Sequence, residues 1–166
     1  MILPIVKINE RIRIAKQDSD SSLFMNLMYA GEQLLKLVTC ALISGLKDNK
    51  GSEENDQYSC YYKVVRADSI GVWATVLENI LTGPSFHNLS EDYKQFVLEL
   101  NQKNTNPSWQ YGSLIAVNNC LRALNDHTED IPTKPQLKIW FQLFVRLRND
   151  ARAHGIPSAE AISKIC

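Results

Sequence analysis

The 166-residue sequence predicts an all-α fold, a single-domain bundle of about five to six helices. Apolar residues recur at helical spacing along several segments, and capping or stop residues separate these segments. A strand-like alternation of apolar residues occurs only weakly, at 58–65. The composition, 45% hydrophobic and 22% charged, is that of a globular chain that can bury one substantial core.

The first predicted helix covers residues 22–46. A cluster of Asp and Ser residues at 18–22 supplies side-chain acceptors for the first free N–H groups, and Gly45 marks the end. Its apolar stripe consists of Leu23, Leu27, Ala30, Leu34, Leu37, Val38, Ala41 and Ile43. The polar segment 48–59 that follows is expected to be a solvated loop.

Two shorter helices are predicted next. One covers 69–81 and stops at Gly83-Pro84, because proline cannot continue a helix. The other begins at Ser90, a good cap that is followed by two acids in the first turn, and continues through Leu100.

The last predicted helices each begin near a proline or a capping residue. Asn106-Pro107 is expected to place a cap and a first-position proline before a helix that continues through Leu124. Thr133-Lys134-Pro135 opens a fifth helix with a dense apolar face, and Gly155 is its expected stop. A short sixth helix after Pro157 leaves an unfinished apolar pattern, which is typical of the N-terminal part of a longer protein.

Charge and cysteine usage limit the possible partners and compartments. The chain has 18 basic and 18 acidic residues, so any attraction for nucleic acid must come from local clustering. The four cysteines are widely spaced and are expected to be free thiols in a reducing compartment. The N-terminus does not resemble a signal peptide, and the apolar run 34–46 is shorter than the roughly 20 residues that cross a bilayer. We therefore expect a soluble, cytoplasmic protein with no membrane partner.

Arginine, asparagine and histidine crowd the end of the fifth predicted helix, at 144–155. Arg148 and His154 are the candidate pair for chemistry, because a guanidinium binds phosphate and an imidazole moves a proton. Six helical residues turn through about 600°, so the two side chains point about 120° apart. A shared site therefore needs the reach of arginine, a helix that ends before His154, or the same segment of a second subunit.

The charges around this segment allow two interpretations. Asp150 lies four residues before His154, where its carboxylate can orient the imidazole. Arg148 and Arg152 are also four apart, and such a like-charge pair disfavours a helix unless an anion lies between them. Basic residues near a helix C-terminus also stabilise the helix by themselves, which is a purely structural role. Five basic residues against one acid within 134–152 favour the anionic ligand.

An arginine, a polar residue, four further positions and a histidine, late in an all-α domain, resemble the signature of the HEPN superfamily (higher eukaryotes and prokaryotes nucleotide-binding domains). The match lies within 147–155, while the fold class agrees over most of the chain. Many members are metal-independent endoribonucleases of toxin–antitoxin, anti-phage and RNA-processing systems, and others are inactive binding or dimerisation modules. The resemblance implies that Arg148 and His154 are the catalytic pair, that Asn149 is the polar partner, and that two subunits form one composite cleft.

The implied chemistry is cleavage of RNA through its own 2′-hydroxyl. A neutral histidine takes the proton of this hydroxyl while arginine stabilises charge on the phosphate, which gives a 2′,3′-cyclic phosphate and spares DNA. Asp150, Arg152 and Arg146 are then supporting residues that orient the histidine or contact the RNA backbone. No cofactor is expected.

Other residues offer weaker sites. His87 and His127 fall in predicted loops without further ligands at metal-binding spacing, so no metal is expected. Tyr29 and Glu32 can face the motif across the bundle, although the solvent edge of their helix is the favoured position. The three tryptophans, Trp73, Trp109 and Trp140, lie in apolar patterns that predict core positions.

The sequence thus predicts a homodimeric, metal-independent ribonuclease that acts on RNA in an anti-phage or toxin-type system, with an antitoxin or further domains as possible partners. The main alternative is a catalytically inactive module that dimerises or binds a nucleotide or partner helix. A plain interaction bundle whose basic helix meets an acidic protein is a third interpretation.

Overall fold

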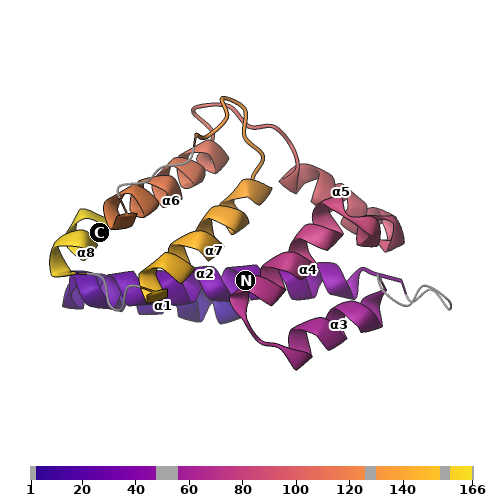
Figure 1. The fold of residues 1–166 in the computed structure, drawn as a ribbon, viewed down its shortest axis with the longest axis horizontal. Coiled ribbons are helices and arrows are strands. Elements are labelled where there is room, and N and C mark those ends of the chain that lie inside the picture. The colour runs from indigo at the N-terminus through magenta and orange to yellow at the C-terminus, as the bar shows by residue number, and fades with distance from the viewer. Residues whose placement is uncertain (1–2, 48–55, 126–129, 154–157, 166) are drawn as a thin grey trace.

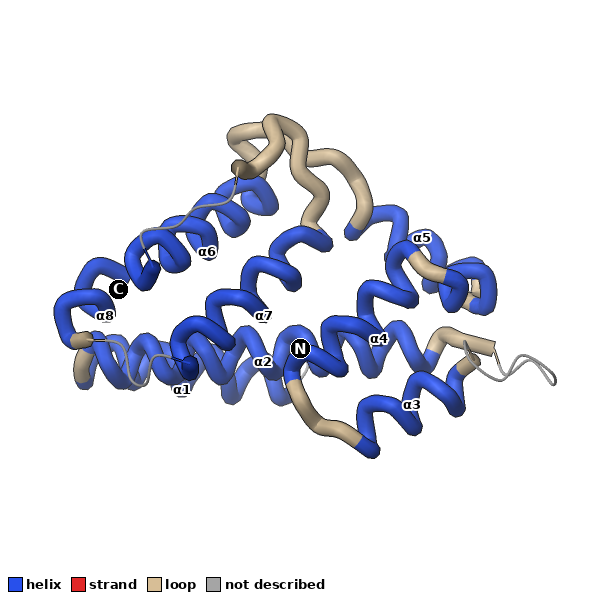
Figure 2. Tube along the Cα trace, viewed as in Figure 1, coloured by secondary structure: helices blue, strands red, loops and turns tan. Residues whose placement is uncertain are grey.

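A computed structural model describes residues 3–47, 56–125, 130–153 and 158–165, and it confirms the all-α fold. Figures 1 and 2 show helices joined by loops, and these residue ranges contain no strand. Two isolated bridges, Leu46 with Leu89 and Lys103 with Gln136, tie neighbouring loops together. The structure has more helices than the expected five or six, because two of them were not predicted.

The N-terminal half begins with a helical hairpin. Helix α1 (Leu3–Asp18), which was not predicted, folds back on α2 (Asp20–Ser44) and buries only Ala15. Ser19 caps α2, its Oγ accepting from Ser22 N at 3.1 Å, and Gly45 forms the C-cap, so both predicted ends of α2 are confirmed.

Helix α3 (Gln57–Arg66) was not predicted. It occupies the segment 58–65, where the sequence showed a weak strand-like alternation, and it begins before residue 59, where the predicted loop was expected to end. Asp56 caps the helix, because its carboxylate accepts from Ser59 N at 2.8 Å. Cys60 and Val64, one turn apart, are the residues that α3 buries, which is helical rather than alternating burial.

The next two helices are those predicted from their caps and stops. Helix α4 (Ile70–Thr82) follows its Ser69 cap and ends at Gly83, before the 3-10 turn η1 (Pro84–Asn88). Helix α5 (Glu91–Leu100) has Ser90 at the N-cap position.

The expected starts of the last two long helices were wrong by two or three residues. Helix α6 (Trp109–Asn125) begins after Ser108, whose hydroxyl accepts from Tyr111 N at 3.2 Å, so Pro107 is not a helical residue. Helix α7 begins at Lys138 because the preceding segment pairs with a loop, as in the 2.9 Å bond from Asn104 N to Pro135 O. Helix α7 continues to Ala153, and the predicted final helix is α8 (Ala159–Ile165).

Helix α2 is the spine of the bundle, with α6, α7 and α8 gathered near its N-terminal half and α3, α4 and α5 near its C-terminal half (Figure 1). The largest buried cluster joins α2 to α3, α4, α5 and α7. A second cluster joins α6 to α7, and a third joins Phe24 of α2 to Ala151 of α7 and Ile162 of α8. The end of α7 is therefore held by packing on the start of α2.

By length and composition alone, α2 could also cross a membrane. It has 25 residues, longer than the apolar run 34–46 suggested, and its most apolar 18-residue window has a mean hydropathy of 1.2. The core helix of a soluble protein passes the same test, and α2 contacts α1, α3, α4, α7 and α8.

Candidate functional site

The predicted motif begins in the second half of α7. Arg148, Asn149 and Asp150 are described in full, and the backbone of Arg152 belongs to the same helix. His154 lies outside the described residues. The geometry of the site is therefore described around Arg148, Asn149 and Asp150.

Arg148 forms an ion pair with Glu32 of α2, across 116 positions of sequence. Its Nε donates to Glu32 Oε1 at 2.7 Å, and both side chains are 18% exposed. Arg148 Nη1 donates a longer bond, 3.5 Å, to Oδ1 of the exposed Asn149. The guanidinium is thus held by one carboxylate at the edge of the core, with its neighbouring amide in solvent.

The expected position of Glu32 at the solvent edge was wrong, while Tyr29 is 41% exposed and has the guanidinium of Arg11 4.5 Å from its ring centre. Glu32 is half-buried because α7 crosses α2 beside it. A carboxylate within an apolar stripe needs a partner, so Glu32 itself was the signal that a basic residue would approach α2 here.

A glycine fixes the crossing of α2 and α7. A Cβ at Gly31 would overlap the ring of Phe144, so the absence of a side chain allows this ring to sit against the α2 backbone. Phe144 also stacks on Trp140, with ring centres 5.2 Å apart and planes 2° apart. Because Arg148 is one turn beyond Phe144 and Glu32 directly follows Gly31, this contact sets the register of the ion pair.

Arg146 and Asp150 form a second, longer ion pair along α7, with 3.8 Å between Nε and Oδ2. Asp150 was expected to orient His154, which lies outside the described residues, and it also pairs with Arg146. Among the described side chains, two ion pairs therefore lie at the second half of α7.

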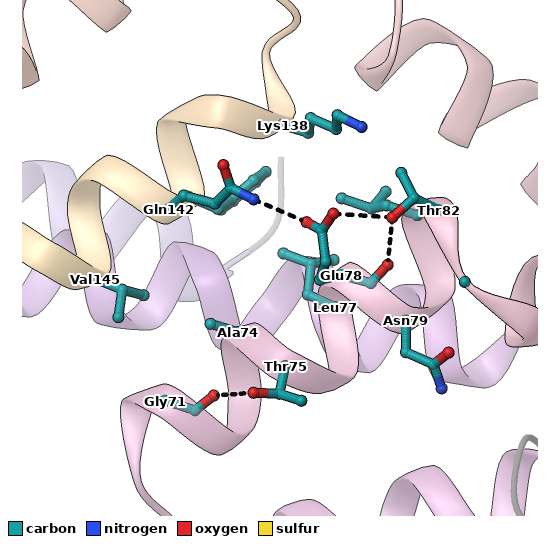
Figure 3. Close-up of a pocket in the computed structure, with 13 residues that line it drawn as sticks. Gly71, Ala74, Thr75, Leu77, Glu78, Asn79, Thr82, Lys138, Gln142 and Val145 are labelled. Atoms are coloured by element: carbon teal, nitrogen blue, oxygen red, sulfur yellow. Dashed lines mark hydrogen bonds between the residues drawn. The ribbon is translucent and has the colours of Figure 1, made fainter. Parts of the chain in front are cut away.

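A cleft of about 510 Å³ lies between α4 and α7, and no motif in the sequence predicted it (Figure 3). Glu78 is its most connected polar group, accepting from Thr82 Oγ1 at 2.8 Å and from Gln142 Nε2 at 3.3 Å. Lys138 and Gln142 lie on the wall formed by α7, on the helical face that leads toward Asn149.

The remaining candidate residues have structural surroundings. His87 lies in η1 with its ring edge-on to Phe86, and His127 lies outside the described residues. The described part of the chain brings no three His, Cys, Asp or Glu side chains together around a possible metal ion. Trp140 packs against the core and Trp73 is half-buried, but the core prediction for Trp109 was wrong, because this side chain is 70% exposed.

The described cysteines are thiols that form no disulfide bond, as expected. Cys60 is fully buried, and desolvation raises the pKa of its thiol. Desolvation also raises the pKa of the half-buried Cys40. Neither residue is a candidate nucleophile, because a raised pKa leaves little reactive thiolate near neutral pH.

No protein-family model, curated protein or solved structure matches this chain, so its similarity to the HEPN superfamily depends on the motif residues and the fold class alone.

Proposed function

We propose that the protein is a metal-independent endoribonuclease of a toxin-type or anti-phage system in the cytoplasm, active as a homodimer. Arg148 binds the scissile phosphate, His154 is the general base, and Asn149 contacts the RNA beside the arginine. Arg146, Asp150 and Arg152 support the site. An antitoxin or a further domain is the expected regulator.

The observation that carries this proposal is the way Arg148 is held. A charge pair at 18% exposure costs desolvation energy that a surface pair does not, so it is weak evidence for a stabilising role. A guanidinium held through Nε on one carboxylate has further N–H donors on its two terminal nitrogens, and the edge that these nitrogens form can bind two phosphate oxygens. Glu32 is then a positioning residue for Arg148.

The reaction needs only these groups and water. The His154 imidazole takes the proton of the ribose 2′-hydroxyl, the 2′-oxygen bonds to phosphorus, and the bond from phosphorus to the 5′-oxygen breaks. Arg148 stabilises the charge on the non-bridging oxygens, and the 5′-oxygen takes a proton from solvent. The products are a 2′,3′-cyclic phosphate and a 5′-hydroxyl.

The test is cleavage of a labelled single-stranded RNA by the purified protein in excess EDTA. We expect cyclic-phosphate ends from the wild type and at least a hundredfold slower cleavage by Arg148→Ala and by His154→Ala, following the usual contribution of about 10²–10⁴ from a general base. Arg13→Ala is the matched control, since Arg13 is also paired with a glutamate but lies on α1, and it should cleave at the wild-type rate. Wild-type rates in both motif variants would refute the proposal.

Exposed apolar side chains favour a second candidate, an inactive dimerisation module. Leu3 and Ile14 of α1 are 63% and 54% exposed, and Met25 of α2 is 57% exposed. These residues lie on the hairpin of α1 and α2, and exposed apolar side chains that gather on one face are typical of a protein–protein contact. A dimer in sedimentation equilibrium, together with no RNA cleavage by the wild type, would favour this module over the ribonuclease.

A further inference from the structure

Helix α3 presents an aromatic face to solvent. Tyr58, Tyr61, Tyr62 and Val65 follow the i, i+3, i+4, i+7 spacing of one helical face and are 73%, 38%, 52% and 81% exposed. The opposite face of α3 supplies its buried residues. Three exposed tyrosines on a helix of 10 residues are far more aromatic surface than its packing requires.

The exposed rings are ordered along the helix. Tyr58 and Tyr62 are stacked, with centres 6.4 Å apart and planes at 20°. The Arg66 guanidinium lies 5.9 Å from the centre of the Tyr62 ring and continues the row by one more turn. Aromatic rings and planar guanidiniums in a row are the groups on which successive bases of a single strand stack.

The charge of this face suits a polyanion. Helix α3 has two basic residues in its last turn, Lys63 and Arg66, and no acidic residue. Two described carboxylates flank the helix, and both accept hydrogen bonds. Asp56 caps the helix, and Asp68 accepts from the Lys36 ammonium at 2.6 Å and from the Trp73 indole N–H at 2.7 Å. These two hydrogen bonds, Lys36 first, lower the pKa of Asp68.

The aromatic face also ends close to the candidate site. Lys36 lies one turn after Glu32 on α2, a rise of about 6 Å. The Lys36 ammonium is bonded to Asp68, two residues beyond Arg66. The C-terminal end of α3 is thus joined to the turn of α2 that follows the partner of Arg148.

We propose that the row Tyr58, Tyr62 and Arg66 on α3 is a stacking surface for single-stranded RNA, which holds about two to three nucleotides of a strand that reaches Arg148. This inference rests on the proposed ribonuclease function and names the form of RNA that the site takes. Paired RNA is excluded, because its bases are already stacked and its edges are not free to cover exposed rings.

The test separates binding from cleavage by using a probe that cannot be cut. The probe is a 5′-fluorescein-labelled 2′-O-methyl oligouridine of twelve nucleotides, and its binding to the full chain is followed by fluorescence anisotropy. The double variant Tyr58→Ala/Tyr62→Ala should weaken binding at least tenfold, since stacking contributes about 1–3 kcal/mol per base. Arg66→Ala should also weaken binding and reduce the slope of log affinity against log salt by about 0.7, the value for one phosphate contact of a single strand.

Three controls make the result specific. Tyr58→Phe/Tyr62→Phe keeps both rings and should bind within twofold of the wild type. Trp109→Ala removes a ring of similar exposure from α6, which lies at the opposite edge of the molecule from α3 in Figure 1, and should leave binding unchanged. A labelled duplex of the same length should bind at least tenfold more weakly, and far-UV circular dichroism should show wild-type helicity in each variant.

The inference is overturned if the alanine double variant binds the probe as the wild type does, or if the phenylalanine variant loses binding equally. It is also overturned if the wild type does not bind the probe or binds the duplex as tightly. Failure of the ribonuclease proposal has a different signature, because cleavage would be absent while ring-dependent binding of the uncleavable probe persists.

Discussion

Replacing Glu32 with glutamine removes the charge that Arg148 Nε–H meets but keeps the size and shape of the side chain. The two charges are in contact, with 2.7 Å between Nε and Oε1, and both side chains are 18% exposed. Opposite charges about 4 Å apart attract by about 4 kcal/mol at an effective dielectric constant of 20, before the cost of desolvation. Removing one partner costs about 3–5 kcal/mol in a fully buried pair, and exposed pairs contribute about 0–1 kcal/mol. Glu32→Gln should therefore lower the free energy of unfolding by about 2 kcal/mol.

The assay is urea unfolding of the wild type, Glu32→Gln, Arg148→Met and the double variant, followed by far-UV circular dichroism. A slope of about 2 kcal/mol/M converts the expected loss into a midpoint shift of about 1 M. These four proteins form a double-mutant cycle, which separates the Glu32–Arg148 interaction from the other interactions of Glu32. The coupling energy between the two residues should be at least about 1 kcal/mol. The exposed pair of Glu10 and Arg13 is the matched control and should show no measurable coupling. A coupling energy below about 0.3 kcal/mol for Glu32 and Arg148, the limit of ordinary additivity, would refute the assignment of Glu32 as the partner that holds Arg148.

Three further results are expected. Gly31→Ala should lower the free energy of unfolding by about 1–3 kcal/mol, because the added methyl group overlaps Phe144. Gly71→Ala should raise it by about 0.5–1 kcal/mol, because the added methyl group meets no atom within 4 Å. A stabilised Gly31→Ala or a destabilised Gly71→Ala in thermal unfolding would contradict this packing. Desolvation of Cys60 raises its folded-state pKa, so the unfolded chain ionises first and stability falls as pH rises above about 8.5; urea midpoints from pH 8 to 10 should fall less steeply in Cys60→Ala than in the wild type. Trp109→Phe should remove most of the acrylamide-quenchable tryptophan fluorescence, and an unchanged quenching constant would show that this side chain is covered.

Local signals in the sequence were sufficient for much of the fold. Serine caps at 19 and 69 and glycines at 45 and 83 bound α2 and α4 in the structure as the sequence indicated, because capping depends on a few neighbouring residues. Helix α1 was missed although Ile5, Ile8, Ile12 and Ala15 recur at helical spacing; the stripe is short, and of its residues only Ala15 is buried. The start of α7 was missed because the pairing of 135–136 with 103–104 is a tertiary contact, which has no local sign.

In the candidate site too, some features follow from local sequence and others depend on tertiary packing. The residue types and spacing of Arg148, Asn149 and Asp150 identified a region of α7, and the charge pattern indicated that Arg148 would need an anion. The sequence left two positions open for Glu32, facing the motif or at the solvent edge, and the crossing of two helices at Gly31 decides between them. The exposure of Trp109 was likewise unpredictable, since its spacing fits a core position and only the tertiary packing leaves it in solvent.

The distance in sequence between the two members of the ion pair has a consequence for synthesis of the chain. Glu32 leaves the ribosome 116 residues before Arg148, which at about 5–20 residues per second is a delay of roughly 6–23 s. During this interval a nascent chain already contains Glu32 on α2 but not Arg148. If the arginine cuts RNA, a cell making this protein is shielded from partly made copies, since damage to its transcripts begins only with chains that have been translated beyond α7.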